Sequence, residues 1–382
     1  MAPTLALAHD YLTQKGGAER VVLSLAKAFP GSRLYTALYD AESTFPLPAE
    51  TEVKTSFLGK IPAFRRNHRL AFLLYPLAFA SLKADADLVL CSSSGWAHGI
   101  SASGLKVVYC YTPPRWLYLA HDYLKGMPFA AKAADKIASP FLRAWDKRAA
   151  RSCAAYIAVS SIVRKRIEDI YRVETEVIHP PLTFAGSGPT QPVEQAGDEF
   201  FLTVARLLPY KNVDAVVAAF RQLPWQLVVV GDGPMAGRLE QIAPPNVVFI
   251  RNASDSQLRW LYSKCMGLVS AAFEDFGLSP LEAAFFRKPA AVLRYGGHLD
   301  TVIEGQTGVF FDDPTPSSIA EALRQLVEAS WNEEDLKRHA ESFSEERFIV
   351  QIRRALERIS GIRLPGGPFG QNEQRPPATT VC

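Results

Sequence analysis

Cysteine is scarce in this chain of 382 residues, and the few cysteines form none of the usual structural patterns. Their number is odd and no two are spaced as CxxC: Cys91, Cys110, Cys153, Cys265 and Cys382. An odd count without such pairs argues against a disulfide framework and against a structural zinc site. We therefore expect the protein to work in a reducing compartment, the cytoplasm.

A hydrophobic run long enough to cross a membrane is also missing. The longest run, Leu70 to Leu82, is well short of the roughly 20 residues that a membrane span needs, and it contains Pro76. Near the N-terminus, His9 and Asp10 interrupt the chain before a signal-length apolar run accumulates, so no export signal is expected.

Basic residues directly precede this apolar run, namely Arg65, Arg66, His68 and Arg69. Cations beside apolar side chains can hold a protein on an anionic membrane, here the inner face of the cytoplasmic membrane. A core helix that follows a solvated basic loop explains the same residues. The sequence leaves both interpretations open.

Charge of one sign is not in excess, because 42 Lys and Arg face 39 Asp and Glu and leave a formal net charge of +3. This balance gives no support to a nucleic-acid partner. The glycine fingerprint GxGxxG is absent after the first predicted strand, which argues against an NAD-dependent oxidoreductase. The composition is that of an ordinary globular protein.

Short β-rich runs alternate with helical stretches over almost the whole chain, a pattern typical of parallel sheets covered on both faces by helices. The predicted strands are 4–10, 88–91, 107–109, 155–159, 200–205, 226–230, 246–250, 267–271, 290–294 and 308–311. Both halves repeat the pattern. We therefore expect an α/β chain with two Rossmann-like domains that face each other across a cleft.

Proline, glycine and serine are concentrated between Val177 and Glu199, which predicts an interdomain linker with its boundary near residue 190. A helix and a tail rich in Pro and Gly follow the second domain. The predicted plan is an N-terminal domain, a C-terminal domain, a helix that packs on the N-terminal domain and a disordered tail, at residues 1–185, 186–345, 346–360 and 361–382.

Two cations, Arg206 and Lys211, follow the first predicted strand of the second half, ahead of a helix that starts near Asn212. They are well placed for a diphosphate, because charge-assisted bonds and helix N-terminal N–H groups add together. Solvated loop charges are the alternative. Gly16 and Gly17, between the first strand and the first helix, could also bring N–H groups to a phosphate, although a GG pair alone is more typical of a turn.

The stretch EDFGLSPLE places Glu274 and Glu282 on either side of a glycine turn. Ser279 fits the N-cap of a helix, with Pro280 at its first position and Glu282 in a capping box, which explains Glu282 without a ligand. It does not explain Glu274, in the loop after a predicted strand. A loop acid, a glycine and a helix N-terminus would bring a carboxylate near sugar hydroxyls and free N–H groups near a phosphate.

Asp85 and Asp87 form a DxD pair, a spacing that can bind a metal ion. They precede a predicted strand instead of following one, so we interpret them as a solvated turn. No metal site is expected from this pair.

In this order the motifs resemble those of the retaining glycosyltransferases of family four, which have the GT-B fold, and particularly their bacterial mannosyltransferase-like branch. The resemblance runs from Leu5 to Ile359 through HDYLTQKGGAERVV, CSSSGWAHGI, YTPPRWLY, VARLLPYKNVD, GDGP, EDFGLSPLEA and GGHLDTVIEGQTGVFF. Each motif is weak alone, but the ordered set is specific. It implies that the N-terminal domain binds an acceptor and the C-terminal domain binds a nucleotide sugar.

The E-x7-E motif of that family matches Glu274 and Glu282. The resemblance implies that Glu274 lies beside the transferred sugar and that Glu282 binds the nucleotide ribose. The backbone at Phe276, Gly277 and Leu278 would meet the distal phosphate.

Arg206 and Lys211 match the diphosphate-binding pair of the family, and Gly16 and Gly17 match its N-terminal glycine loop. His98 matches a histidine that lies near the donor sugar in the family. A structural histidine after a strand is the alternative for His98.

The resemblance implies a retaining, metal-independent hexosyl transfer from a nucleotide diphosphate sugar to a hydroxyl of a glycan, glycolipid or lipid-linked acceptor, without a cofactor. GDP-mannose is the first choice of donor and a UDP-sugar the second. Asp10, Tyr11 and Arg115 are the candidate acceptor-binding residues. Two alternatives stay open: a nucleotide-sugar epimerase or hydrolase, and a non-catalytic two-domain ligand-binding protein.

Three positions depart from the pattern of the family. Asp300 stands where relatives often have Glu, Ser160 where Asn is usual, and Asn252 where Gly is common. The departures concern base identity and fine specificity, and they leave the diphosphate residues unchanged.

Overall fold

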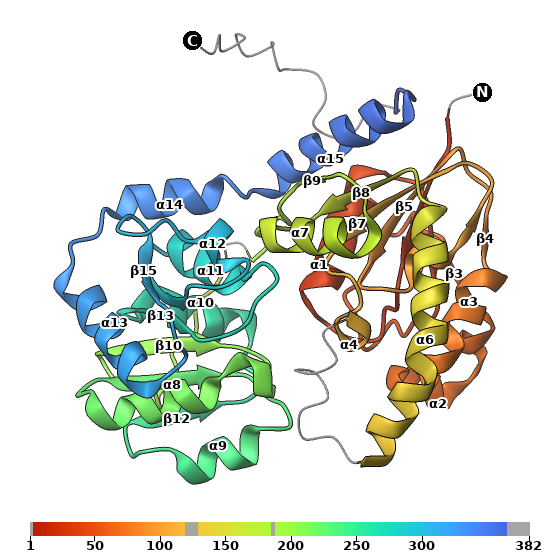
Figure 1. Cartoon of the computed structure of the whole chain (residues 1–382). Coiled ribbons are helices and arrows are strands. Elements are labelled where there is room, and N and C mark those ends of the chain that lie inside the picture. The colour runs from red at the N-terminus through yellow and green to blue at the C-terminus, as the bar shows by residue number, and fades with distance from the viewer. Residues whose placement is uncertain (1–2, 119–128, 185–187, 365–382) are drawn as a thin grey trace. The chain divides into compact units, whose positions relative to one another are not determined.

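The computed structural model describes residues 3–118, 129–184 and 188–364. Contacts divide the chain into two compact units (Figure 1). The first unit is Met1–Cys110, Phe141–Ile157 and Glu345–Cys382, and the second is Tyr111–Pro140 and Ala158–Ser344. The predicted domain boundary at residues 185 and 186 and most of the predicted tail lie outside the described residues.

A parallel sheet forms the core of the first unit. Its strands are β1 (Leu5–His9), β2 (Arg33–Thr36), β3 (Val53–Thr55), β5 (Leu88–Ser93), β7 (Leu105–Cys110) and β8 (Ala155–Ala158). They lie in the order β3-β2-β1-β5-β7-β8, and β1 pairs in parallel with both β2 and β5. The short strands β4 (Lys83–Ala84) and β6 (Ser101–Ala102) form a separate parallel pair.

Helices surround this sheet. They are α1 (Gly17–Ala28), α2 (Pro62–Arg66), α3 (Tyr75–Ser81), the end of α6 (Phe129–Arg151) and α15 (Glu345–Ser360), with 3-10 turns η1 (Phe57–Lys60), η2 (His68–Leu74) and η3 (Ala97–Gly99). Among the described residues, none of these helices is long and apolar enough to cross a membrane.

The C-terminal helix α15 packs on the first unit, which confirms the predicted return of this helix to the N-terminal half. Lys27 Nζ lies 2.9 Å from Glu345 Oε2, and the rings of Tyr109 and Phe348 are 5.5 Å apart. Arg353 also donates a hydrogen bond to the last turn of α1, at 2.8 Å.

The second unit contains a six-stranded parallel sheet. Its strands are β10 (Phe200–Val204), β11 (Gln226–Val230), β12 (Val247–Ile250), β13 (Gly267–Ser270), β14 (Ala290–Leu293) and β15 (Gly308–Phe311). They lie in the order β12-β11-β10-β13-β14-β15, and every neighbouring pair is parallel. Counted along the unit, this is the order 3-2-1-4-5-6 of a Rossmann fold.

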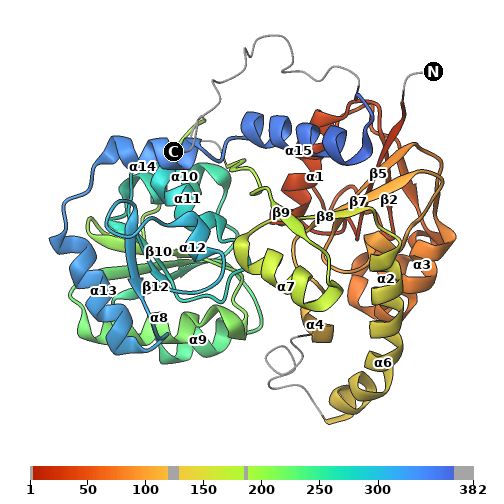
Figure 2. The same cartoon turned by 45° about the horizontal axis from the view of Figure 1, so that its top comes forward.

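Helices cover both faces of this second sheet (Figure 2). One face carries α8 (Val213–Ala219), α9 (Ala236–Ile242) and α13 (Pro316–Glu328), and the other carries α10 (Asp255–Lys264), α11 (Leu278–Phe285) and α14 (Glu333–Glu341). The same unit includes α4 (Arg115–Tyr118), α7 (Ser161–Tyr171), β9 (Thr175–Val177), the 3-10 turns η4 (Pro209–Lys211) and η5 (Phe220–Gln222), and α12 (His298–Thr301).

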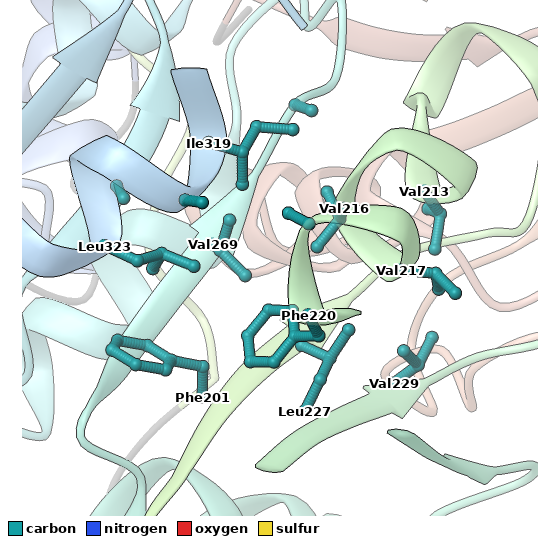
Figure 3. Close-up of a cluster of buried hydrophobic side chains, with 14 of the residues drawn as sticks. Phe201, Val213, Val216, Val217, Phe220, Leu227, Val229, Val269, Ile319 and Leu323 are labelled. Atoms are coloured by element: carbon teal, nitrogen blue, oxygen red, sulfur yellow. The ribbon is translucent and has the colours of Figure 1, made fainter. Parts of the chain in front are cut away.

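Strand residues alternate between two buried clusters on these faces, because successive side chains of a strand point to opposite sides. Phe201 belongs to the cluster under α8 and α13, together with Phe220 and Leu323 (Figure 3). Phe200 belongs to the cluster on the opposite face, with Tyr262 of α10. Both faces of the sheet are therefore packed against helices.

Candidate functional site

The carboxyl ends of β10 and β13 form the point of the second unit where a ligand is expected. β10 and β13 are neighbours in the sheet. The chain runs from β10 to β11 on one side of this pair and from β13 to β14 on the other side, so the loops that follow β10 and β13 lead in opposite directions. Open parallel sheets bind ligands at this switch point. Arg206 and Lys211 lie in the loop after β10 and Glu274 lies in the loop after β13, so these three predicted residues lie in the loops of two neighbouring strands.

Lys211 and Glu274 form a partly buried ion pair in which Lys211 Nζ donates to Glu274 Oε1. Lys211 Nζ also lies 5.2 Å from the centre of the Tyr210 ring. Burial acts to raise the pKa of Glu274, but the charge and hydrogen bond of Lys211, together with the charge of Arg115, outweigh it and hold that pKa below its ordinary value. Glu274 is therefore a carboxylate at neutral pH.

Arg206 differs from Lys211 in its surroundings. Its side chain is exposed, and it forms no ion pair with any residue that the structure describes. One cation of the predicted diphosphate pair is thus held by a carboxylate, whereas the other faces solvent.

Asp275, the neighbour of Glu274, is bound by two arginines. Arg115 Nη2 lies 2.5 Å from Asp275 Oδ1, and Arg166 Nη1 donates to the same oxygen. Arg115 also donates to the backbone oxygen of Phe273 at 3.4 Å, and Ser160 Oγ donates to that of Asp275. These bonds fix the loop that carries Glu274.

The structure thus places Arg115, a predicted acceptor-binding residue, at the loop of the E-x7-E motif, and its acceptor role stays a prediction. Sequence reasoning missed Arg166. It is one of three consecutive cations at 164–166 on α7, and nothing in that run distinguishes the arginine that faces Asp275 from its solvated neighbours.

The loop after β14 packs directly against the Glu274 loop because its glycines allow close approach. Gly297 N donates to Glu274 O at 3.1 Å. A Cβ atom on Gly296 would stand only 2.1 Å from the same oxygen. Any side chain at residue 296 would therefore push the two loops apart.

Two of the departures from the family pattern meet at the start of α7: Ser160 is part of this turn, and Asp300 of α12 contacts the next residue, Ser161. Asp300 Oδ1 accepts from Ser161 Oγ at 2.6 Å and Asp300 Oδ2 accepts from Ser161 N at 3.0 Å. Ser160 is the N-cap of α7 and accepts from Val163 N at 3.3 Å. The short side chain of Asp300 thus places both of its carboxylate oxygens against Ser161.

The predicted start of α11 is wrong. Ser279 is not the N-cap and Glu282 forms no capping box: the helix begins at Leu278, after Gly277, which has a φ of +88°. Ser279 Oγ instead donates to Val204 O at 3.3 Å, and Glu282 Oε2 accepts from Tyr262 Oη at 2.5 Å. Glycine reaches this left-handed conformation at little cost, so the turn closes before Ser279. No side chain caps the N–H groups at this end of the helix.

His298 is a site residue that sequence reasoning missed. It is fully buried, and its Nδ1 lies 3.1 Å from Leu293 O, so Nδ1 carries the proton and donates. Its Nε2 has no hydrogen-bond partner among the described residues. Burial lowers the pKa of His298, although Glu274 acts in the opposite direction. In a neutral imidazole, Nε2 is therefore a hydrogen-bond acceptor without a donor, and it lies beside Gly277. In the sequence, the position of His298 directly after Gly296 and Gly297 was the feature that could have identified it as a site residue.

We predict that Gly277→Ala destabilises the protein by about 1 to 3 kcal/mol. The new Cβ atom would stand 2.9 Å from His298 Cδ2, and alanine is strained at a φ of +88°. Thermal unfolding measures the loss. Gly237→Ala is the control, because a Cβ atom there meets nothing within 4 Å. Equal melting temperatures for the two variants would contradict the strain at Gly277.

The remaining predicted residues lie in the first unit, at the carboxyl ends of β1 and β5. Asp10 is buried, and its carboxylate accepts from the backbone N–H groups of Ser94, Trp96 and Ala97 at 2.6 to 3.1 Å and from Ser93 Oγ at 3.0 Å. These bonds hold the loop that leads to His98. They explain Asp10 without a ligand, and its acceptor role stays a prediction.

His98 is buried too. Its Nε2 lies 3.2 Å from Asp146 Oδ1, its ring is 5.4 Å from the Trp145 ring, and its backbone oxygen accepts from Lys106 Nζ at 2.9 Å. This environment fits the structural interpretation of the histidine. Its predicted place near the donor sugar stays a prediction.

His98→Ala is expected to lower the free energy of unfolding by about 2 to 4 kcal/mol, because it leaves a cavity beside Trp145 and removes one partner of the buried Asp146. Chemical denaturation measures this loss. A stability equal to that of the wild type would contradict the structural role. Turnover of the folded variant gives a second result, since a tenfold fall in kcat is expected only if His98 contacts the donor sugar.

Gly16 is the N-cap of α1 and Gly17 begins that helix. Gln14 Nε2 donates to Glu19 Oε1 at 3.0 Å beside this turn. Tyr11 stacks on His68 with ring centres 4.3 Å apart. The glycine turn therefore has the predicted position after β1, and its phosphate contact stays a prediction.

The DxD pair has partners within the fold. Asp87 Oδ2 accepts from Thr4 N at 2.8 Å, and Asp85 Oδ1 accepts from Ser103 Oγ at 3.2 Å. In the part of the chain that the structure describes, no group of three or more His, Cys, Asp or Glu is arranged to hold a metal ion.

Both halves of this chain match profiles of known protein families. The profile described as Glycosyltransferase Family 4 matches residues 15–183, and the profile described as Glycosyl transferases group 1 matches residues 189–343. The chain belongs to the group 1 glycosyltransferases, and its own N-terminal half matches the family 4 profile. It has the GT-B fold.

The sequence is 24% identical to human alpha-1,3/1,6-mannosyltransferase ALG2 over 402 residues, covering 90% of this chain and 93% of ALG2. It is 25% identical to the uncharacterized glycosyltransferase MJ1178 of Methanocaldococcus jannaschii over 174 residues, which is 42% of this chain and about half, 48%, of that protein. The structure of Anabaena Alr3699/HepE, solved in complex with UDP-glucose, superposes with a TM-score of 0.68 at 17% identity, covering 93% of this chain and 99% of that one.

Proposed function

We propose that the protein is a retaining, metal-independent hexosyltransferase that uses a nucleotide diphosphate sugar. The acceptor is a hydroxyl of a glycan, a glycolipid or a lipid-linked sugar. The observation that carries the proposal is the group at the switch point of the second unit, where the Lys211–Glu274 pair lies in the same pair of loops as the exposed Arg206 and ahead of the uncapped start of α11.

Each part of this group suits one part of such a donor. The leaving diphosphate gains negative charge as the anomeric bond breaks, so cations and helix N–H groups directed at it lower the barrier. Arg206, Lys211 and the backbone at Phe276 to Leu278 supply these groups. Glu274, a carboxylate, orients the sugar hydroxyls, and Glu282 binds the ribose.

Donor binding would break the Lys211–Glu274 ion pair. Lys211 bonds a carboxylate in the structure and would bond a phosphate in the complex, which frees Glu274 for the sugar. In the transfer step, the acceptor hydroxyl oxygen bonds to the anomeric carbon while the bond to the diphosphate breaks. The leaving phosphate oxygen takes the hydroxyl proton on the same face, so the configuration is retained.

The mannose assignment is supported by human ALG2, whose name describes a mannosyltransferase, and by the bacterial mannosyltransferase-like motifs. UDP-sugars are the second choice, and HepE was solved with UDP-glucose. We place the protein in the cytoplasm, in peripheral contact with an anionic membrane, where a lipid-linked acceptor is accessible.

Transfer assays with GDP-mannose and UDP-glucose test this function. The expected result is sugar transfer to a lipid-linked acceptor in EDTA, with proton NMR showing the donor's anomeric configuration in the product. Consumption of donor without acceptor would instead identify an epimerase or hydrolase. An inverted product or a strict metal requirement would contradict the proposed mechanism.

A further inference from the structure

Large apolar side chains are exposed together on one segment of the first unit, residues 57–77. Of the eleven large hydrophobic residues that are exposed in the described part of the chain, five lie there: Phe57, Ile61, Leu70, Leu73 and Leu77. The three leucines are each more than 60% exposed. Single exposed leucines need no explanation, but a cluster of this kind marks an interaction site.

The exposure follows from the way in which the segment folds. Ala71, Tyr75, Ala78 and Phe79 point into the first unit and are buried. Leu70, Leu73 and Leu77 occupy the opposite side of η2 and α3, at a spacing that keeps them on one helical face. One side of this run is therefore buried, as the core interpretation expects, and the other side is exposed.

The charged side chains of the same segment are all basic. Between Glu52 and Asp85 the chain has no acidic residue and six Lys or Arg. Four of these cations are exposed within residues 57–77, and none of them forms an ion pair with a described residue: Lys60, Arg65, Arg66 and Arg69. The unit thus presents leucines and unpaired cations on one stretch of surface.

We propose that residues 57–77 dock on the surface of an anionic lipid bilayer. Leu70, Leu73 and Leu77 would enter the boundary between headgroups and acyl chains, and the cations would bind lipid phosphates. Apolar side chains beside cations suit this partner in particular, because a nucleic acid offers phosphates without an apolar layer. The proposal assigns a surface to the membrane contact of the proposed function, on which it rests.

Vesicle sedimentation tests the proposal without any transfer assay, so the surface and the enzymatic function can fail separately. The wild type should bind vesicles of phosphatidylcholine with 30% phosphatidylglycerol and should bind pure phosphatidylcholine far more weakly. Salt should reduce binding, since the headgroup attraction is screened. Each exposed cation removed should lower the partition coefficient roughly fivefold.

Matched variants separate this surface from nonspecific effects. Arg65→Ala with Arg66→Ala should lower binding roughly 25-fold, whereas Arg238→Ala with Lys264→Ala removes two exposed cations of the second unit and should change it little. Leu70→Ser, Leu73→Ser and Leu77→Ser together should abolish binding at moderate salt. Leu105→Ser with Val327→Ser, also exposed, should leave it intact. Melting temperatures equal to that of the wild type show that each variant is folded.

Three results would overturn the proposal. The first is wild-type binding that does not depend on phosphatidylglycerol, and the second is equal loss in the control variants. The third is a wild-type dimer in analytical ultracentrifugation that the three leucine changes convert to monomer without altering vesicle binding, because the face would then belong to a second copy of the chain.

Discussion

Glu274→Gln is expected to lower kcat by two to three orders of magnitude while the affinity for the nucleoside diphosphate changes less than threefold. Glutamine keeps the shape of the side chain and loses its negative charge. In the proposed mechanism, the orientation of the donor sugar depends on that charge in the transition state, whereas binding of the diphosphate depends on Arg206, Lys211 and the start of α11. Steady-state kinetics with calorimetric binding of GDP and UDP measures both quantities.

Glu328→Gln provides the control, because Glu328 is exposed on α13 and away from the switch point. It should leave both kcat and affinity unchanged. If Glu274→Gln lowered affinity as much as turnover, Glu274 would be a binding residue only. A wild-type kcat would remove it from the site.

Lys211→Ala is expected to weaken nucleoside diphosphate binding by about 10-fold to 100-fold, since a charge-assisted bond to phosphate is lost. It also leaves the Glu274 carboxylate without its strongest partner in a partly buried place. Calorimetry measures the affinity, with Lys264→Ala, an exposed lysine on α10, as the control. Wild-type affinity in Lys211→Ala would exclude the lysine from the diphosphate site.

The same variant has a pH signature. The pKa of Glu274 lies below its ordinary value of 4.5 in the wild type, despite burial, because of the charges around it. The stability from this pairing is therefore complete above about pH 4.5 and is lost as pH falls through the lowered pKa. We expect the difference in melting temperature between wild type and Lys211→Ala to be largest near pH 7 and to shrink below pH 4.5. A difference that grows on acidification would contradict the pairing.

The main features of the fold follow from patterns that act locally. The ten predicted strands are present because apolar runs of four to six residues, bounded by turn residues, are buried on both sides in a parallel sheet. Five short strands were not predicted: β2, β3, β4, β6 and β9 have only two to four residues each, and their periodicity is too brief to identify. Their position at or near sheet edges comes from pairing, which sequence patterns do not contain.

The site was predictable where loops follow strands, and less so where contacts cross the fold. Arg206, Lys211 and Glu274 could be grouped because parallel strands bring their carboxyl ends to one edge. His298 and Arg166 reach the site only through packing of α12 and α7 against the Glu274 loop. Propensity also misled at α11, where Ser279 is a good N-cap but Gly277 closes the turn first.

Binding of nucleoside diphosphates is the most direct test of the proposed donor site. Calorimetry with GDP, UDP, GDP-mannose and UDP-glucose in EDTA should show micromolar binding of one nucleotide class to the wild type. Arg206→Ala should abolish it, because Arg206 is the exposed cation at the switch point. Absence of binding of any of the four ligands to the folded wild type would contradict the account, and the family membership would then describe the fold without the transferase site.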